Sequence, residues 1–384
     1  MKIYIEYYGT LILRMLLKIL HVFPIQKKRV LFYSFNGKQY SCNPKQISEC
    51  LIKYNSDIEV IWAFKDPEKF KDILDKRIKI VKFRSVRYYY YAKTSRVIVQ
   101  NVQGFGELSR RQGQDIIQTW HASNGYKQQG KCEGIRRKLE KLYHKDYTYV
   151  MSGAESMTNR RVRGTMGFEG SVLAGTPRMD LIINQNDNEI RKRVYKYFGL
   201  DENTKIVLYA PTWRKDRNDN NYGLDYKKVY DAVKNKYGGE WVILVRLHPN
   251  VYLEPDINFP FMRNATLYPD MQELLYTVDI LISDYSSCIW DFSFTYRPCF
   301  LFCRDIQKYG RDRDFDIPIN KWHFPVSKTM DELIEKIETY DTVKHKEEMK
   351  VHHKEMGNLE DGHATERACD LIIKLCGENN NEKV

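Results

Sequence analysis

Short apolar runs rich in β-branched residues alternate along the chain with longer amphipathic stretches. In the first half, these runs predict buried strands at Arg29–Phe35, Ile58–Phe64, Lys79–Phe83, Arg96–Gln100, Asp115–Trp120, Tyr147–Met151 and Ser171–Ala174. The second half repeats the pattern, with runs at Lys205–Ala210, Trp241–His248, Asp279–Ser283 and Pro298–Cys303. Helical patterns lie between them, at Pro44–Tyr54, Ile135–Tyr143, Tyr226–Tyr237, Asp270–Thr277 and Met330–Tyr340. Strands that alternate with helices in this way form parallel sheets.

Two such halves predict an α/β protein with two Rossmann-like doubly wound domains that face a cleft. We expect an N-terminal segment over residues 1–25, a first domain over residues 26–190 and a second domain over residues 191–384. The polar stretch Asn184–Arg193 is the expected linker between the two domains.

The N-terminal segment has its own pattern of apolar and basic positions. Its apolar stretch, residues 3–23, is interrupted by Glu6, Arg14, Lys18 and His21. In a helix the last three would share one stripe, and the basic run Lys27–Arg29 follows. This favours an amphipathic helix that lies in a membrane interface with basic residues on anionic headgroups. A helix packed on the protein's own core and a membrane-spanning helix are the alternatives.

Composition narrows the class of protein. The chain has 384 residues, of which 42% are hydrophobic, so a core can form and a disordered or collagen-like chain is excluded. The net charge of +12 suits an anionic partner surface, and no nucleic-acid reader motif accompanies it, so we expect no nucleic acid. None of the eight cysteines forms a CxxC pair, which indicates reduced thiols and no metal site.

Two histidines follow predicted strands directly. His121 directly follows the run Asp115–Trp120, and His248 is the last residue of the run Trp241–His248. The carboxyl ends of strands face the ligand crevice in an open α/β sheet, and a histidine there can take a proton from a hydroxyl. Arg246 precedes His248 by two residues, so both side chains can point to one face and meet an anion. A histidine held only by turn hydrogen bonds is the alternative.

The segment after Asp279–Ser283 predicts a phosphate cradle. Asp284 is followed by Ser286 and Ser287 at the start of a helical run, where backbone N–H groups and hydroxyls can meet a phosphate. An ordinary serine N-cap would have the same sequence. Thr212 and Arg214 lie at another strand end, Arg178 lies in a turn, and Arg367 lies in the segment that enters the last helix. Together these residues indicate a site for an anionic phosphate ester.

A competing signal lies in Arg311–Asp316, which contains two D-x-D triplets. Paired carboxylates can hold Mg²⁺ or Mn²⁺ on a nucleotide-sugar. These acids stand in a basic, polar stretch and do not end a clear apolar strand, so we interpret them as solvated or salt-bridged.

Taken in order, the segments resemble the CDP-glycerol glycerophosphotransferase family, the bacterial teichoic-acid primases and polymerases. The family pattern is similar to QTWHGTPLK, G-x-P-R-x-D, Y-x-P-T-W-R, R-x-H-P, T-D-Y-S-S and D-G-x-A-x-E-R. Its counterparts here are Gln118–Lys127, Gly175–Asp180, Tyr209–Arg214, Arg246–Pro249, Ser283–Ser287 and Asp361–Arg367. The segments at 35–38 and Ser41–Lys45 also resemble the family's N-terminal pattern, so the resemblance covers nearly the whole chain.

The resemblance implies a glycosyltransferase-B fold that is peripheral on the cytoplasmic face of the bacterial plasma membrane. It implies transfer of glycerol phosphate from CDP-glycerol to a hydroxyl of an undecaprenyl-linked glycan, with release of CMP and without a metal or cofactor. His121 would be the general base, and His248 would stabilise or protonate the leaving phosphate. The donor would be held by Arg214, Ser286, Ser287 and Arg367.

One departure from the family pattern concerns the acceptor. The usual Gly-Thr-Pro after the catalytic histidine is replaced by Ala122–Gly125 here. The polyol also stays open, since relatives with similar motifs use CDP-ribitol, and capsule assembly is an alternative to teichoic acid assembly. A glycosyltransferase of the same fold with a nucleotide-sugar donor and a non-catalytic membrane-associated assembly partner are the competing hypotheses.

Overall fold

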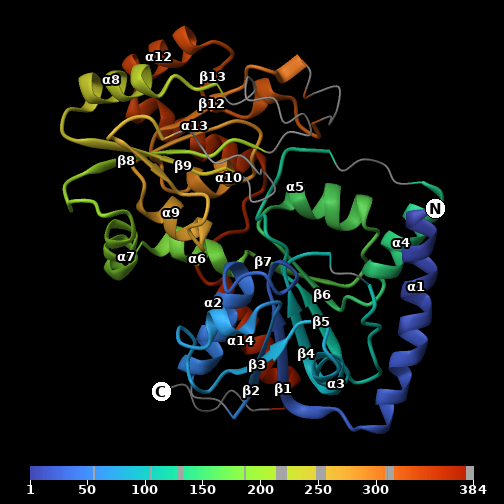
Figure 1. Ribbon diagram of the computed structural model, residues 1–384. Helices are drawn as coiled ribbons and strands as arrows, with labels where there is room; N and C mark the ends of the chain where they lie inside the picture. The colour runs from blue at the N-terminus through green and yellow to red at the C-terminus, as the bar shows by residue number, and fades with distance from the viewer. Residues whose placement is uncertain are drawn as a thin grey trace. The chain divides into compact units, whose positions relative to one another are not determined.

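The computed structural model describes residues 1–54, 57–103, 106–128, 133–185, 187–212, 223–247, 257–307, 309 and 315–377 (Figure 1). The chain divides into two compact units. Unit 1 consists of Met1–Ser123, Gly130–Asp180 and Leu359–Val384, and unit 2 consists of Asn124–Gln129 and Leu181–Asn358.

Unit 1 is built on a sheet of seven parallel strands in the order β3-β2-β1-β4-β5-β6-β7. The strands are β1 (Gln26–Tyr33), β2 (Glu59–Phe64), β3 (Lys79–Lys82), β4 (Ser95–Gln100), β5 (Asp115–Gln118), β6 (Tyr149–Ser152) and β7 (Ser171–Ala174). The chain direction across the sheet reverses between β1 and β4. In a doubly wound sheet this reversal opens a crevice at the carboxyl ends of the strands.

Helices cover both faces of this sheet, which explains the nearly unbroken apolar runs of the central strands. Val30 and Phe32 of β1 belong to one core cluster, while Leu31 and Tyr33 belong to another on the opposite face. The helical elements are α1 (Lys2–Leu16), the 3-10 helices η1 (Leu17–Val22), η2 (Phe35–Gly37) and η3 (Pro67–Phe70), α2 (Cys42–Lys53), α3 (Val86–Thr94), α4 (Gly134–His144), α5 (Glu155–Met157), the π-helix η4 (Thr158–Thr165), α6 (Pro177–Asn184) and α14 (Ala364–Leu375).

Unit 2 repeats the topology with six parallel strands in the order β10-β9-β8-β11-β12-β13. The strands are β8 (Lys205–Tyr209), β9 (Trp241–Val245), β10 (Met262–Asn264), β11 (Ile280–Ser283), β12 (Cys299–Phe302) and β13 (Val326–Ser327). The helices are α7 (Asn188–Phe198), α8 (Tyr226–Tyr237), α9 (Met271–Thr277), α10 (Cys288–Ser293), η6 (Ile319–Lys321), α12 (Met330–Glu338) and α13 (Thr342–Glu355). The reversal here lies between β8 and β11.

The predicted fold class is confirmed: each predicted strand run contains a strand, and the two sheets are parallel and doubly wound. The short edge strands β10 and β13 were not predicted. The Asn184–Arg193 stretch is not a polar loop, since α6 ends at Asn184 and α7 begins at Asn188. The side chain of Asp187 accepts a hydrogen bond from the Glu189 N–H and so caps α7.

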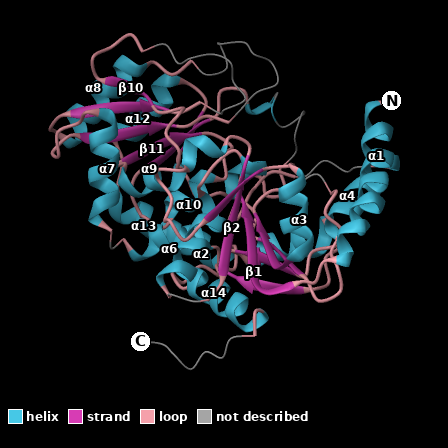
Figure 2. Ribbon diagram, turned by 60° about the horizontal axis from the view of Figure 1, so that its bottom comes forward, coloured by secondary structure: helices cyan, strands magenta, loops and turns pink. Residues whose placement is uncertain are grey.

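The compact units follow the chain differently from the expected domains. The chain leaves unit 1 after Asp180 and not near residue 190, and its last segment returns to unit 1. Helix α14 lies beside α2 (Figure 2) and buries Ala368, Cys369 and Ile372 in the same core cluster as Val30 of β1. An apolar face on the last helix therefore completes the first sheet.

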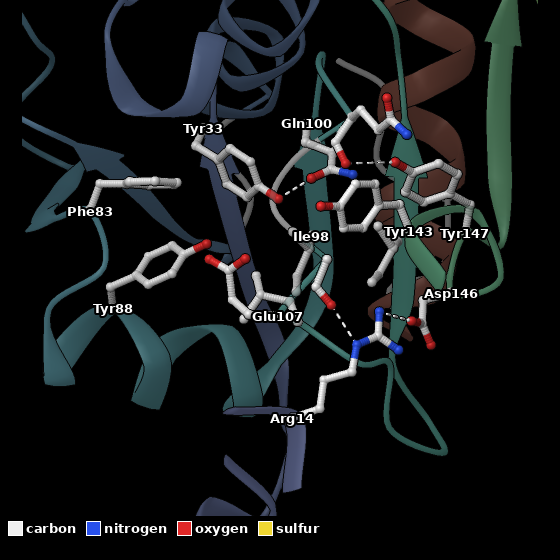
Figure 3. Close-up of a pocket in the computed structure, with 14 residues that line it drawn as sticks. Arg14, Tyr33, Phe83, Tyr88, Ile98, Gln100, Glu107, Tyr143, Asp146 and Tyr147 are labelled. Atoms are coloured by element: carbon white, nitrogen blue, oxygen red, sulfur yellow. Dashed lines mark hydrogen bonds and ion pairs between the residues drawn. The ribbon is translucent and has the colours of Figure 1, made fainter. Parts of the chain in front are cut away.

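The N-terminal helix α1 differs from the expected amphipathic helix in the place of one basic residue. Its inner face packs Ile3 and Tyr7 on α4 and also carries Arg14, which is only 7% exposed. Figure 3 shows Arg14 at a buried polar pocket of unit 1, where its guanidinium pairs with Asp146 at 2.8 Å and donates to the carbonyl of Leu142 at 2.8 Å. The expected basic stripe of Arg14, Lys18 and His21 toward headgroups is therefore wrong for Arg14.

The outer face of α1 and η1 is apolar and exposed. Its members are Tyr4, Ile5, Tyr8, Leu11, Ile12, Met15, Leu16, Ile19, Val22 and Phe23. Their spacing follows the helical period, so they form one continuous stripe. Within the part of the chain that the structure describes, α1 and the other helices are too short or too polar to cross a bilayer.

Truncating Ile372 to alanine tests the return of α14 to unit 1. The side chain is fully buried, so we expect a loss of about 2–5 kcal/mol in the free energy of unfolding of unit 1. Hydrogen exchange followed by mass spectrometry should show faster exchange in β1 and α2 and unchanged exchange in β8 and β9. Lys374→Ala, on the exposed face of α14, is the control. Faster exchange confined to β8 and β9 would contradict the assignment.

Candidate functional site

In unit 1 the carboxyl ends of three neighbouring strands carry the candidate residues. Ser34 follows β1, Asn101 follows β4 and His121 lies just beyond β5. The Asn101 side chain donates to the Ser34 hydroxyl at 3.0 Å and accepts from the backbone N–H of Phe35 at 2.8 Å. These contacts join the ends of β1 and β4 at the point where the strand order reverses.

His121 is exposed and its ring is oriented by Asn101. The ring nitrogen Nδ1 lies 2.9 Å from the backbone carbonyl oxygen of Asn101. A carbonyl oxygen only accepts hydrogen bonds, so Nδ1 carries the proton and Nε2 of the neutral ring carries a lone pair. The Phe35 ring lies beside the imidazole, with 5.6 Å between the ring centroids. This arrangement suits a general base that acts through Nε2.

The backbone before His121 is fixed by a buried asparagine. Asn43, in the first turn of α2, donates to the carbonyl oxygens of Thr119 and Trp120, each at 2.9 Å. Trp120 has a φ of 52°, in the left-handed region where a bulky residue is strained. The Asn43 carbonyl oxygen in turn accepts from the backbone N–H of Arg178 at 2.9 Å. Asn43 therefore ties the turn at residues 175–178 to the backbone that presents His121.

Glu360 fixes the same loop on the other side of His121. Its carboxylate accepts hydrogen bonds from the Ser123 hydroxyl, from the Thr176 hydroxyl at 2.7 Å and from the Thr176 N–H at 2.9 Å. Gly153 lies against Ser123 and Glu360 so closely that a Cβ there would clash with both. Burial raises the pKa of the Glu360 carboxyl to about 7, although its hydrogen bonds act in the opposite direction.

The chain enters unit 2 directly after Ser123. Tyr126 is buried there, with its ring stacked on Trp322 at a centroid distance of 4.3 Å. Its hydroxyl lies 2.7 Å from Nε2 of His352, and its carbonyl oxygen accepts from the N–H of Asp316 at 2.9 Å. The loop that carries His121 is therefore anchored at both ends.

In unit 2 the residues expected to bind the phosphate ester lie at the carboxyl ends of β8, β9 and β11. Asp284 is buried, and its Oδ1 accepts from the backbone N–H of Thr212 at 2.9 Å. Ser286 and Ser287 precede α10 and are partly exposed. Ser287 is the N-cap of α10, although its side chain makes no capping hydrogen bond. The structure thus brings Thr212, Asp284 and the two serines to neighbouring strand ends of one sheet.

Two of the expected arginines have guanidinium groups that bind protein groups, and a third is buried. The guanidinium of Arg246 donates to the carbonyls of Ala265 and Tyr268 at 2.9 and 2.7 Å. Arg367 binds Asp361 and the carbonyl of Ala174 within unit 1, although it was expected in the second domain. Arg178 is buried, 7% exposed, and its backbone N–H donates to the side-chain oxygen of Asn43. These contacts position backbone segments of the site.

Parts of the sequence prediction fall outside the described residues. His248 and Arg214 both lie there, and so do residues 311–314 of the D-x-D stretch. The roles given to them stay predictions.

The sequence interpretation did not single out Asn43, Asn101 or Glu360 as site residues. Asn43 lies within the Ser41–Lys45 segment that supported the resemblance, and Glu360 directly precedes the Asp361–Arg367 motif. Their position next to motifs was the available signal. Asn101 acts on His121 through its backbone carbonyl. Every residue has such a carbonyl, so the sequence carries no signal for this contact.

Comparison with known proteins identifies the family to which the chain is similar. Residues 15–374 match the family CDP-Glycerol:Poly(glycerophosphate) glycerophosphotransferase. A teichoic acid poly(glycerol phosphate) polymerase from Staphylococcus epidermidis is 30% identical over 302 residues, which are 75% of this chain and 42% of that protein. One of the same description from Bacillus spizizenii is 26% identical over 398 residues, covering 97% of this chain and 99% of that protein.

Solved structures with the same fold as this chain include a cell-wall polymerase. The wall teichoic acid polymerase TagF superposes with a TM-score of 0.82 at 26% identity, covering 99% of this chain and 98% of that chain. A histidine variant of TagF has also been solved after soaking with CDPG. Since the family match extends over nearly the whole chain and includes every motif described above, the chain belongs to the CDP-glycerol:poly(glycerophosphate) glycerophosphotransferase family.

Proposed function

We propose that the protein transfers glycerol phosphate from CDP-glycerol to a hydroxyl of a membrane-linked glycan or polyol-phosphate acceptor and releases CMP. The observation that carries this proposal is the orientation of His121 by the Asn101 carbonyl, at the carboxyl edge of a sheet in a chain of this family. Glycerol is favoured over ribitol because both relatives described above are poly(glycerol phosphate) polymerases. The product belongs to teichoic acid or capsule assembly.

The proposed chemistry is a single phosphoryl transfer. Nε2 of His121 takes the proton of the acceptor hydroxyl, and the oxygen attacks the phosphorus that bears glycerol. The bond from this phosphorus to the bridging oxygen breaks, and CMP leaves with the electron pair. Such a transfer depends chiefly on positioning and on stabilisation of charge. His248 is proposed to stabilise or protonate the leaving phosphate.

The donor is proposed to lie on unit 2. Ser286 and Ser287 offer hydroxyls that are partly exposed at the end of β11, and Thr212 offers another at the end of β8. Arg214 is the proposed cation for the diphosphate. Asp284, Arg246 and Arg367 are assigned as positioning residues, because the side chain of each binds a backbone group of a neighbouring segment. Arg178 stays a proposed substrate-binding residue.

The acceptor side is proposed to meet an anionic membrane surface through α1. A contiguous exposed apolar stripe on a helix marks an interaction surface. Lys18 and Lys27 are exposed next to this stripe and can reach anionic headgroups. The protein would thus be peripheral on the cytoplasmic face, where an undecaprenyl-linked acceptor presents its hydroxyl.

Replacing His121 by alanine tests the general base. We expect CMP release from CDP-glycerol to fall by about 10²–10⁴-fold, because a positioned base contributes that much to the rate. The assay compares CDP-glycerol and CDP-ribitol with a membrane extract that contains undecaprenyl-linked glycans. Thermal protection by CDP-glycerol should be the same in the variant and the wild type, which shows that donor binding is intact. Full activity of His121→Ala would refute the assigned base.

The Glu360 network predicts a dependence of stability on pH. The folded-state pKa of about 7 lies above the ordinary value of 4.5, so this contribution is present below about pH 4.5 and is lost as the pH rises through about 7. The difference corresponds to about 3 kcal/mol at most. Glu360→Gln keeps the shape and cannot ionise.

We therefore expect the Tm of Glu360→Gln, relative to wild type, to rise from about pH 5 to about pH 8. Scanning calorimetry of both proteins across this range measures the effect. Thr176→Val, which removes one hydroxyl and keeps the carboxyl, should retain the pH dependence. Parallel Tm curves for wild type and Glu360→Gln would show that the carboxyl does not titrate in this range.

Charging the apolar stripe tests the membrane surface. Ile12 and Met15 are 55% and 63% exposed, so Ile12→Asp with Met15→Asp should leave the fold intact. Binding to vesicles of anionic phospholipid should weaken by at least about tenfold, because two apolar side chains no longer leave water. Val343→Asp, at an exposed apolar position of α13, is the control. Unchanged co-sedimentation of the double variant would exclude α1 as the membrane contact.

A further inference from the structure

A cluster of two histidines and a glutamate lies in unit 2, outside the residues assigned to the transfer reaction. One ligand atom from each of His323, His352 and Glu355 lies within 4.8 Å of the other two. His352 and Glu355 are three residues apart on α13 and so share one face of the helix. His323 comes from the segment between η6 and β13.

Each histidine has one ring nitrogen bound by a group outside the cluster. Nδ1 of His323 lies 2.7 Å from Oε2 of Glu348. Nε2 of His352 lies 2.7 Å from the hydroxyl of Tyr126. The remaining nitrogen of His323, Nε2, lies 2.8 Å from Oε2 of Glu355. The two rings thus have their outer nitrogens bound by oxygen groups.

The remaining nitrogen of His352 has no hydrogen-bond partner. His352 is fully buried, and its Nδ1 makes no hydrogen bond in the described structure. A buried polar atom without a partner costs about 1–3 kcal/mol, and such atoms are rare in folded proteins. A bound group that accepts the lone pair of Nδ1 would remove this cost.

The backbone at His323 is a second independent sign of a built site. Its φ is 59°, in the left-handed region that a non-glycine residue seldom adopts. Such strain persists where the surrounding structure holds it and concentrates at functional positions. This conformation points the imidazole at Glu355 and Glu348 of α13.

We propose that His323, His352 and Glu355 bind a divalent transition metal of the Zn²⁺ class, through Nε2, Nδ1 and a carboxylate oxygen. Two histidines and one carboxylate are an established ligand set for zinc, with bonds of about 2.0–2.1 Å and a fourth position for water. Tetrahedral ligands at this bond length stand about 3.4 Å apart. Nε2 of His323 and Oε2 of Glu355, now 2.8 Å apart, would therefore separate slightly on binding, and no pair of ligand atoms starts more than 4.8 Å apart. Glu355 is exposed, which gives a metal ion and a water molecule access.

The groups around the cluster match the outer shell of a metal site. A histidine that binds a metal donates its other N–H to a carboxylate, a carbonyl or a hydroxyl-type acceptor. Glu348 fills this role for His323, and the Tyr126 hydroxyl fills it for His352. These partners would hold the rings so that Nε2 of His323 and Nδ1 of His352 face the metal.

The metal site would also fix the end of the loop that carries His121, a consequence that rests on the proposed function. Tyr126 belongs to the segment Asn124–Gln129 of unit 2, five residues after His121 in the chain. Its ring packs on Trp322, which directly precedes His323. A metal that orders His323 and His352 would therefore order Tyr126 from two sides.

Cobalt binding tests the site without any substrate. The full chain, stripped with a chelator, is titrated with Co²⁺ at about pH 8, where the histidine ligands are deprotonated. We expect one equivalent of cobalt with the intense visible absorption of tetrahedral coordination, and displacement of this signal by Zn²⁺. Zn²⁺ should also raise the Tm of the wild type by mass action.

Variants separate this site from adventitious binding. His323→Ala and Glu355→Gln should lose the cobalt signal, and Glu348→Gln should weaken binding by about 10–100-fold, as expected of an outer-shell residue. Glu347→Gln, an exposed acid on the same helix that pairs with Lys350, is the matched control and should bind like wild type. Equal cobalt binding by wild type and His323→Ala, or no tetrahedral signal in the wild type, would overturn the site.

Hydrogen exchange tests the effect on the loop. Peptides that cover residues 119–128 should exchange more slowly in the zinc-loaded protein than in the stripped protein. The same peptides should show no zinc effect in Glu355→Gln. Cobalt binding without this protection would overturn the link to the His121 loop, and CMP release decides the transfer reaction separately, since neither metal readout depends on it.

Discussion

The buried carboxyl of Glu360 is the contact on which the arrangement of the site in unit 1 depends. It joins three parts of the sequence: the Ser123 end of the His121 loop, the turn at Thr176 and its own C-terminal segment. A buried carboxylate is costly unless donors surround it, so the three segments must meet for the group to be accommodated. These contacts add to the apolar packing of α14 in linking the last segment of the chain to the first sheet.

His121 depends on a second set of contacts that also crosses the sequence. Asn43 holds the strained backbone at Trp120, and the carbonyl of Asn101 selects the ring tautomer. Asn43 acts through its side-chain amide on two backbone carbonyls, and Asn101 acts through its own backbone carbonyl. The orientation of the His121 ring is therefore fixed before any ligand binds, which is the preorganisation that a catalytic group requires. The topological reversal at β1/β4 brings together the strand ends that carry Ser34 and Asn101.

In the N-terminal helix a charged residue lies on the inner face, and most of the apolar residues lie on the outer face. Arg14 pairs with Asp146 and donates to backbone carbonyls inside unit 1, and Ile3 and Tyr7 pack on α4, so the helix is fixed while most of its apolar residues stay outside the core. The apolar residues therefore stay exposed as one stripe. A continuous exposed apolar stripe of this kind differs from the polar outer face of an ordinary surface helix.

The sequence by itself determined the alternation of strands and helices, the two parallel sheets and the ordered motifs, because the period of apolar positions and local turn residues are local properties. It also identified His121 as the residue at a strand end. Only the tertiary structure decided which face of α1 is buried, the role of Glu360, the engagement of Arg246 and Arg367 by carbonyls and the meeting of His323 with His352. These features arise between residues far apart in the chain, and the free energy that selects them is that of burying charges with partners, which no local pattern encodes.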